Sequence, residues 1–77
     1  MMTSEEINYA MKNKVPVEYR GKTYDYIQEY IMWYDRKNQK ITSFGLVETR
    51  KEHDEQGHEV KKVTIVRVPS DGVTIAK

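Results

Sequence analysis

Residues 23–34 read Thr-Tyr-Asp-Tyr-Ile-Gln-Glu-Tyr-Ile-Met-Trp-Tyr, and the conformation of this segment decides the fold of the chain. Eight of the twelve residues are β-branched or aromatic, a composition that favours a strand. The alternative is a helix with four apolar residues along one face, Tyr24, Ile27, Ile31 and Tyr34. We predict a long bent strand with a bulge near Gln28 and Glu29.

In the strand interpretation, apolar side chains point to both faces of this segment. Simple alternation assigns one face to Tyr24, Tyr26, Tyr30, Met32 and Tyr34. It assigns the other face to Ile27, Ile31 and Trp33. A strand that is apolar on both faces contacts two layers of structure, which is why a bend is expected.

A short amphipathic helix is predicted over residues 3–13. Thr3 is the expected N-cap, and Glu6, three positions later, completes a capping box. The apolar stripe of this helix consists of Ile7, Ala10 and Met11. Asn13 is expected to end the helix in a left-handed conformation, because Pro16 prevents its continuation.

The rest of the chain predicts four more strands, over residues 15–19, 41–51, 59–68 and 73–75. Gly21 is expected to adopt positive φ in a tight turn at residues 20–22. Polar hairpin loops are expected at residues 35–40 and 52–58, and a turn of 3₁₀ helix at residues 69–72. Gly45, inside a strand, indicates a bulge or a close approach of another group to the backbone.

One helix followed by five strands predicts a mainly β protein. The expected architecture is a small SH3-like or Sm-like five-stranded bent antiparallel sheet or barrel with a short N-terminal helix, because closing the sheet removes exposed edges. A single domain is expected over residues 1–77, with the helix at residues 3–13 and the barrel at residues 15–76.

The composition excludes several classes of protein. The 77 residues include 13 Lys+Arg and 12 Asp+Glu, and a protein that binds mainly by neutralising phosphates usually has a clear basic excess. The absence of cysteine excludes disulfides, thiolate nucleophiles and zinc–thiolate sites. No apolar run is long enough for a membrane span, and the acidic residues 1–6 are not typical of a secretory signal. A cytoplasmic protein is expected.

No residue pattern predicts catalysis. None of the three serines, Ser4, Ser43 and Ser70, lies in a Gly-x-Ser-x-Gly elbow. His53 and His58 have neighbouring carboxylates and are of the types that bind metals, but a polar turn of this kind is more typical of a solvated loop. Asp25 and Glu29 are too far apart in a strand for a tight carboxylate pair. We predict no enzymatic activity, no metal and no cofactor.

The strand pattern of the chain resembles that of a group of small phage proteins. The residues concerned are Val15-Pro16-Val17-Glu18-Tyr19-Arg20-Gly21-Lys22-Thr23-Tyr24, Ile27, Tyr30-Ile31, Leu46-Val47-Glu48 and Val63-Thr64-Ile65-Val66. After a short N-terminal helix, this pattern is similar to that of small proteins of phages and prophages in Firmicutes. The resemblance covers most of the chain after residue 10. It implies host takeover, inhibition of bacterial immunity or an accessory role, in the cytoplasm of the host cell.

The row of tyrosines in residues 23–34 is the strongest candidate for a binding surface. A small barrel buries only about two or three rings of one strand, so the surplus rings are expected to face a partner, a second copy or a ligand. The alternative is that the helix over residues 3–13 covers the row and the tyrosines form a second small core. The predicted aromatic walls of the site are Tyr24, Tyr26, Tyr30 and Trp33. Arg20 and Arg36 are the predicted anion contacts, because a guanidinium group binds phosphate or carboxylate in a bidentate manner.

These features predict a phage-type binding protein that acts by occupancy. Its expected partner is a host defence protein or a small nucleotide-like signalling ligand. A homo-oligomer is also expected, most simply a symmetric dimer through residues 24–34, because the rings are in excess and the net charge is near zero. The alternative is a nucleic-acid-binding Sm-like or SH3-like module, with Gly21, Asp35 and Asn38 in the positions of the Gly, Asp and Asn of the Sm motif.

Overall fold

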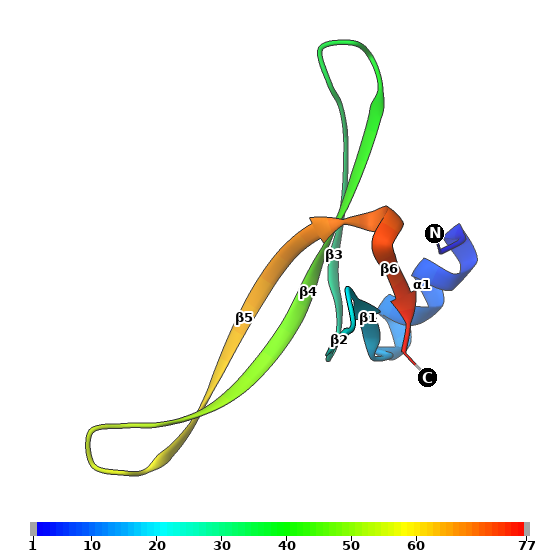
Figure 1. The fold of residues 1–77 in the computed structure, drawn as a ribbon. Coiled ribbons are helices and arrows are strands. Elements are labelled where there is room, and N and C mark those ends of the chain that lie inside the picture. Colours follow the sequence, from blue (N-terminus) through cyan, green and yellow to red (C-terminus); the bar gives the residue numbers. More distant parts are fainter. Residues whose placement is uncertain (1, 77) are drawn as a thin grey trace.

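The computed structural model describes residues 2–76, which form one helix, six strands and a short 3₁₀ turn (Figure 1). In chain order these elements are α1 (Ser4–Asn13), β1 (Val17–Tyr19), β2 (Lys22–Tyr24), β3 (Tyr26–Tyr34), β4 (Lys40–His53), β5 (Glu59–Pro69), the 3₁₀ turn (Ser70–Gly72) and β6 (Val73–Ile75). The prediction of a mainly β chain with a short N-terminal helix is confirmed.

The strands form two antiparallel three-stranded sheets, one with the order β2-β1-β6 and one with the order β3-β4-β5. The Asp25 N–H donates to the Val47 carbonyl at 2.8 Å and links the two sheets. Residues 2–76 do not close into the predicted barrel. The strand lengths explain this difference, since β1, β2 and β6 have three residues each while β4 has 14 and β5 has 11.

Residues 22–34 are extended, so the helical alternative for this segment is wrong. The segment is divided into two strands at Asp25, one in each sheet, rather than forming the single strand predicted. Its register against β4 shifts between Ile27 and Glu29, which confirms the bulge predicted near Gln28.

This bulge changes the faces to which the aromatic side chains point. Ile27 pairs with Leu46 and Tyr30 pairs with Phe44, and both pairs lie on the core face of the sheet because Leu46 and Phe44 are two residues apart. Met32 and Tyr34 follow on that same face. The other face carries Tyr26, Ile31 and Trp33, so the face assignment predicted by simple alternation is wrong beyond the bulge.

Helix α1 begins at the predicted capping box. The Thr3 side chain accepts a hydrogen bond from the Glu6 N–H, and the Glu6 carboxylate accepts one from the Thr3 N–H. Ile7 and Ala10 are buried and Met11 packs against the core, as the stripe predicted. The left-handed residue at the C-terminus is Lys14, with φ 51°, and not Asn13 as predicted.

The β1–β2 connection is a two-residue turn between the paired residues Tyr19 and Lys22. Arg20 and Gly21 both have positive φ, at 50° and 77°, which is the backbone of a type I′ hairpin. The positive φ predicted for Gly21 is confirmed.

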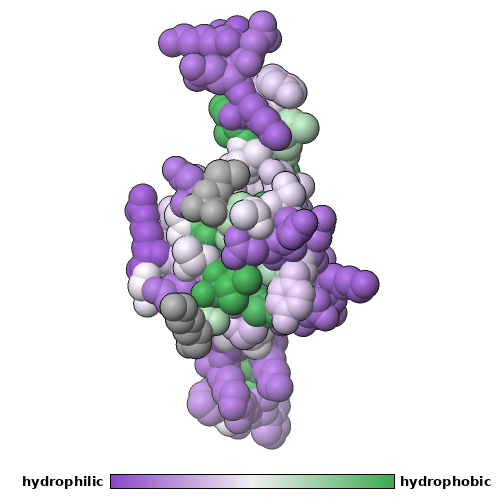
Figure 2. Space-filling view, turned by 90° about the vertical axis from the view of Figure 1, so that its right-hand side faces the viewer, coloured by the Kyte–Doolittle hydropathy of each residue, from purple (hydrophilic) through white to green (hydrophobic). Residues whose placement is uncertain are grey.

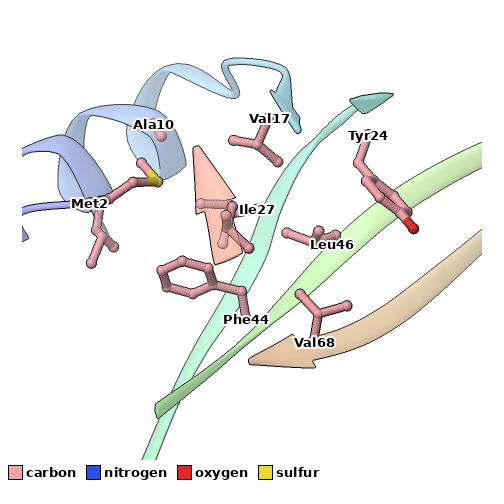
Figure 3. Close-up of a cluster of buried hydrophobic side chains, with 10 residues drawn as sticks. Met2, Ala10, Val17, Tyr24, Ile27, Phe44, Leu46 and Val68 are labelled. Carbon is pink, nitrogen blue, oxygen red and sulfur yellow. The ribbon is translucent and has the colours of Figure 1, made fainter. Parts of the chain in front are cut away.

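The core lies between α1 and the two sheets (Figure 3). Its largest fully buried side chains are Phe44, Ile27, Leu46, Val17 and Val73. The Tyr30 ring packs edge-on against the Phe44 ring, with centroids 5.3 Å apart and planes at 74°. The helix and each of the six strands contribute at least one buried side chain to this single small apolar cluster.

Two hairpins project well beyond this core (Figure 1). We call residues 30–41, which end β3 and begin β4, the distal hairpin, and residues 48–64, which end β4 and begin β5, the charged arm. The molecule measures 52 × 30 × 22 Å with a radius of gyration of 14.8 Å. A compact chain of this length would have a radius of gyration of about 11.5 Å.

Gly45 is required because another side chain crosses its backbone, as predicted. The Glu29 side chain lies over Gly45 and accepts a hydrogen bond at 2.8 Å from Arg67 Nε, on the far side of β4. A Cβ atom at Gly45 would lie 2.4 Å from Glu29 Cγ. Glycine thus permits an ion pair that spans all three strands of the sheet.

We expect Gly45→Ala to lower the free energy of unfolding by roughly 1–3 kcal/mol, the range typical of an overpacked site. Glu29→Ala empties the space that the new methyl group needs, so Gly45→Ala should cost much less in the Glu29→Ala background. Urea unfolding of the four proteins measures this coupling. An equal cost in both backgrounds would contradict the packing described here.

Candidate functional site

The structure distributes the six predicted site residues over four places. Tyr24 is only 8% exposed and belongs to the core, so it is not part of a binding surface. Arg20 lies in the β1–β2 turn, with its guanidinium group 5.4 Å from the centre of the Tyr19 ring. Tyr26 is half-buried, with Lys14 Nζ 5.3 Å from its ring centre.

The other three predicted residues, Tyr30, Trp33 and Arg36, lie together in the distal hairpin. Exposed apolar side chains are concentrated here: Trp33 is 44% exposed, Met32 48% and Tyr34 61%. Because alternate residues of a strand point to opposite faces, Trp33 lies on one face of the hairpin, and Met32 and Tyr34 lie on the other. The hairpin thus presents large apolar side chains on both faces.

The turn at the end of the distal hairpin is held by Asp35. Its carboxylate accepts hydrogen bonds from the Lys37 N–H at 2.8 Å and the Gln39 N–H at 2.9 Å. The Asp35 N–H donates to the Gln39 carbonyl at 3.0 Å, and Asn38 adopts a left-handed φ of 58°. The side chains next to this turn are therefore presented by an ordered backbone.

The distal hairpin combines these apolar side chains with positive charge. Arg36, Lys37 and Lys40 are exposed, while the only carboxylate of the turn, Asp35, accepts backbone hydrogen bonds. In Figure 2 the end of the hairpin, at the top, is hydrophilic, and apolar atoms lie directly below it. Aromatic and cationic side chains in this arrangement suit contact with an anionic surface that also has apolar patches.

A second cluster of charge, in the charged arm, was missed from the sequence. Arg50 pairs with Lys62 across the two strands on one face of the hairpin, and Lys51 pairs with Lys61 on the other face, so each face carries two neighbouring cations. The turn beyond them carries Glu52, Asp54, Glu55 and Glu59. Two dibasic pairs at equal distances from a hairpin turn are the sequence signal for such a cluster, and it is visible only once the register is known.

The two histidines lie at the end of the charged arm. The Asp54 carboxylate accepts hydrogen bonds from the Gln56 and His58 N–H groups at 2.9 and 2.8 Å and so closes the turn. His58 Nδ1 lies 3.5 Å from Asp54 Oδ2. Within residues 2–76, no three His, Cys, Asp or Glu side chains are grouped so that they could hold a metal ion.

Glu48 lies where the charged arm leaves the core, and it joins the arm to β2. Its carboxylate accepts hydrogen bonds from Lys22 Nζ and, at 3.0 Å, from Arg50 Nε. The Glu48 side chain is only 13% exposed. The hydrogen bonds from Lys22 and then from Arg50 lower the pKa of Glu48 below its usual value of 4.5.

Comparison of the chain with protein-family models, curated proteins and solved structures finds no match. In the part of the chain that the structure describes, no helix is both long enough and apolar enough to cross a membrane. Residues 2–76 also form no pocket.

The lowered pKa of Glu48 predicts that its interactions stabilise the protein above pH 4.5 and lose this effect as the pH falls through the lowered pKa. We therefore expect the wild type to be more stable than Glu48→Gln near neutral pH, and this difference to shrink on acidification. Thermal melts across the acid range measure it. Glu52→Gln, on the same face of β4, controls for loss of a carboxylate, and a pH-independent difference for Glu48→Gln would contradict the assignment.

We also expect the distal hairpin and the core to respond differently to truncation. Phe44→Ala should cost about 3–5 kcal/mol, because it removes a fully buried ring. Trp33→Ala should cost about 1 kcal/mol or less, because Trp33 lies outside the core. Chemical denaturation of both variants measures these free energies, and a similar loss for the two would show that the distal hairpin is part of the folding core.

Proposed function

We propose that the protein acts by occupancy, binding the surface of a partner protein through the distal hairpin and catalysing no reaction. The observation that carries this proposal is the exposure of Met32, Trp33 and Tyr34 on an ordered hairpin outside the core. Trp, Tyr and Arg are the residues most enriched at the energetic centres of protein interfaces. A partner that covers this hairpin would bury side chains that folding leaves in water.

The charges of the hairpin specify the chemistry of that partner. Arg36, Lys37 and Lys40 favour an anionic protein surface with an apolar depression that accepts Trp33. The predicted contacts Tyr30, Trp33 and Arg36 are kept in this proposal. Because Tyr26 and Arg20 lie elsewhere and Tyr24 is buried, the six residues do not surround one small molecule, which favours a protein over a nucleotide-like ligand.

The resemblance to small phage and prophage proteins supports a class for the partner. We propose a bacterial host defence protein, inhibited in the host-cell cytoplasm when the hairpin covers a surface that it needs. The SH3-like assignment belongs to the same proposal. It is supported by the order of the elements and by the hydrogen bond from Asp25 to Val47 that joins the two sheets.

A nucleic-acid partner is the second candidate, favoured by one observation. The charged arm carries one pair of neighbouring cations on each face, Arg50 with Lys62 and Lys51 with Lys61. Binding through these cations would weaken steeply as salt concentration rises. The acidic turn beyond them opposes this candidate, since its carboxylates would approach the same phosphates.

The proposal is tested with the immobilised protein, nuclease-treated bacterial lysate and two variants. A specific partner should be retained by the wild type and by Tyr9→Ala, a matched control, since Tyr9 is exposed to a similar extent on α1. Immobilised Trp33→Ala should no longer retain this partner. For the purified partner, Trp33→Ala should weaken binding at least about tenfold, in line with an interface hot spot of about 2 kcal/mol.

Two outcomes would overturn the proposal. The first is an equal affinity of the wild type, Trp33→Ala and Arg36→Ala for every partner found. The second is binding that disappears on nuclease treatment and falls steeply with salt, which would instead support the charged arm as a nucleic-acid site. Expression of wild type and Trp33→Ala in a host that carries a phage-defence system then tests whether the hairpin blocks defence.

A further inference from the structure

β5 is an edge strand, and a long and regular one. It pairs only with β4, and its register runs without a shift from Pro69 opposite Ser43 to Glu59 opposite His53. Its side chains from residue 59 to residue 65 are exposed. The other edge of this sheet, β3, is interrupted by the bulge and contacts α1. Proteins usually protect a long regular edge because it is a template for another strand.

The hydrogen bonds around β4 show which backbone groups of β5 face this open edge. The Asp54 N–H donates to the His58 carbonyl at 2.9 Å, in the same register as the β4–β5 ladder. In an antiparallel ladder, successive residues direct their backbone N–H and C=O groups to alternate sides of the strand. The even-numbered residues of β4 and β5 therefore bond to each other, and the backbone groups of the odd-numbered residues of β5 face the open edge. The Val47 carbonyl, which accepts from Asp25, and Pro69, which has no N–H, both fit this alternation.

We infer that the β5 edge pairs with the same edge of a second copy of the chain, about a two-fold axis at Val63. The two sheets would then form one continuous antiparallel sheet, joined by about ten backbone hydrogen bonds. The cross-strand pairs between the copies are Glu59 with Arg67, Val60 with Val66, Lys61 with Ile65, Lys62 with Thr64 and Val63 with itself.

The charges of β5 select this register from the alternatives. Because the backbone groups of odd-numbered residues face the open edge, odd residues of one copy pair with odd residues of the other, and even with even. The sum of two paired residue numbers is therefore even, so the two-fold axis passes through a residue and not between two residues. An axis at Lys62 would place Lys62 opposite itself, and an axis at Thr64 would place Lys61 opposite Arg67. Both arrangements set like charges in contact, which is destabilising. Among registers that overlap most of the strand, the axis at Val63 alone sets an anion opposite a cation.

The side chains around the axis complement one another. Val63 is 64% exposed and Ile65 is 48% exposed, and both lie on the face of the sheet opposite the core, so the two copies would bury them together. Arg67 bonds Glu29 through Nε, and its terminal nitrogens can reach Glu59 of the second copy. The dimer contact thus lies on β5 and not on residues 24–34, where the sequence predicted it.

Light scattering on the purified chain tests the association without any other partner. The wild type should have twice the mass of one chain at micromolar concentration. Val63→Pro should be a monomer that still melts cooperatively, because the N–H that it removes faces away from β4. Val63→Thr, which keeps the N–H, is the matched control and should remain dimeric. A monomeric wild type would overturn the inference.

Cysteine cross-linking tests the register and does not depend on Val63→Pro folding. The chain has no cysteine, so each introduced thiol is the only one per copy. Under mild oxidation Val63→Cys should form a disulfide-linked dimer, since residue 63 faces itself, and Ile65→Cys should not. A mixture of the single variants Lys61→Cys and Ile65→Cys should cross-link, since residue 61 of one copy faces residue 65 of the other. Cross-linking of Ile65→Cys as fast as that of Val63→Cys would overturn the proposed axis.

Discussion

Burial of residues 44–47 is the constraint on which the rest of the structure depends. Phe44 and Leu46 fill the space under α1, and β4 is the one strand of its sheet with a neighbour on each side. The Val47 carbonyl holds the second sheet through Asp25, and Gly45 allows Glu29 to cross to Arg67. Helix, bulged strand, edge strand and second sheet therefore take their positions from four consecutive residues of β4.

The charges of the chain nearly cancel in number but are separated in space. The distal hairpin is cationic, the middle of the charged arm holds four cations, and the turn of that arm is acidic. A net charge of +1 is thus the sum of distinct patches. The distal hairpin and the charged arm project from different ends of the molecule (Figure 1), while within the arm cations and carboxylates adjoin, with Lys51 Nζ 3.5 Å from Glu59 Oε1. Each patch interacts with the groups around it, so the net charge of the whole chain does not describe the electrostatics of any one patch.

Features that depend on a few neighbouring residues could be predicted from the sequence. The capping box at Thr3, the positive φ of Gly21, the bulge near Gln28 and the close approach at Gly45 are of this kind. The face of Tyr30 could not be predicted by alternation, because one extra residue reverses every side chain beyond it. The open sheets and the two cation pairs of the charged arm depend on strand lengths and on the β4–β5 register, which local patterns do not specify.

The shortness of the buried stretch has a consequence for how the sequence can change over time. Most positions of the distal hairpin and the charged arm make no contact with the core, so substitutions there are close to neutral for folding. These positions are therefore under selection mainly for recognition and only weakly for stability. The surface that contacts other molecules can therefore diverge rapidly between related chains while residues 44–47 and their neighbours preserve the fold.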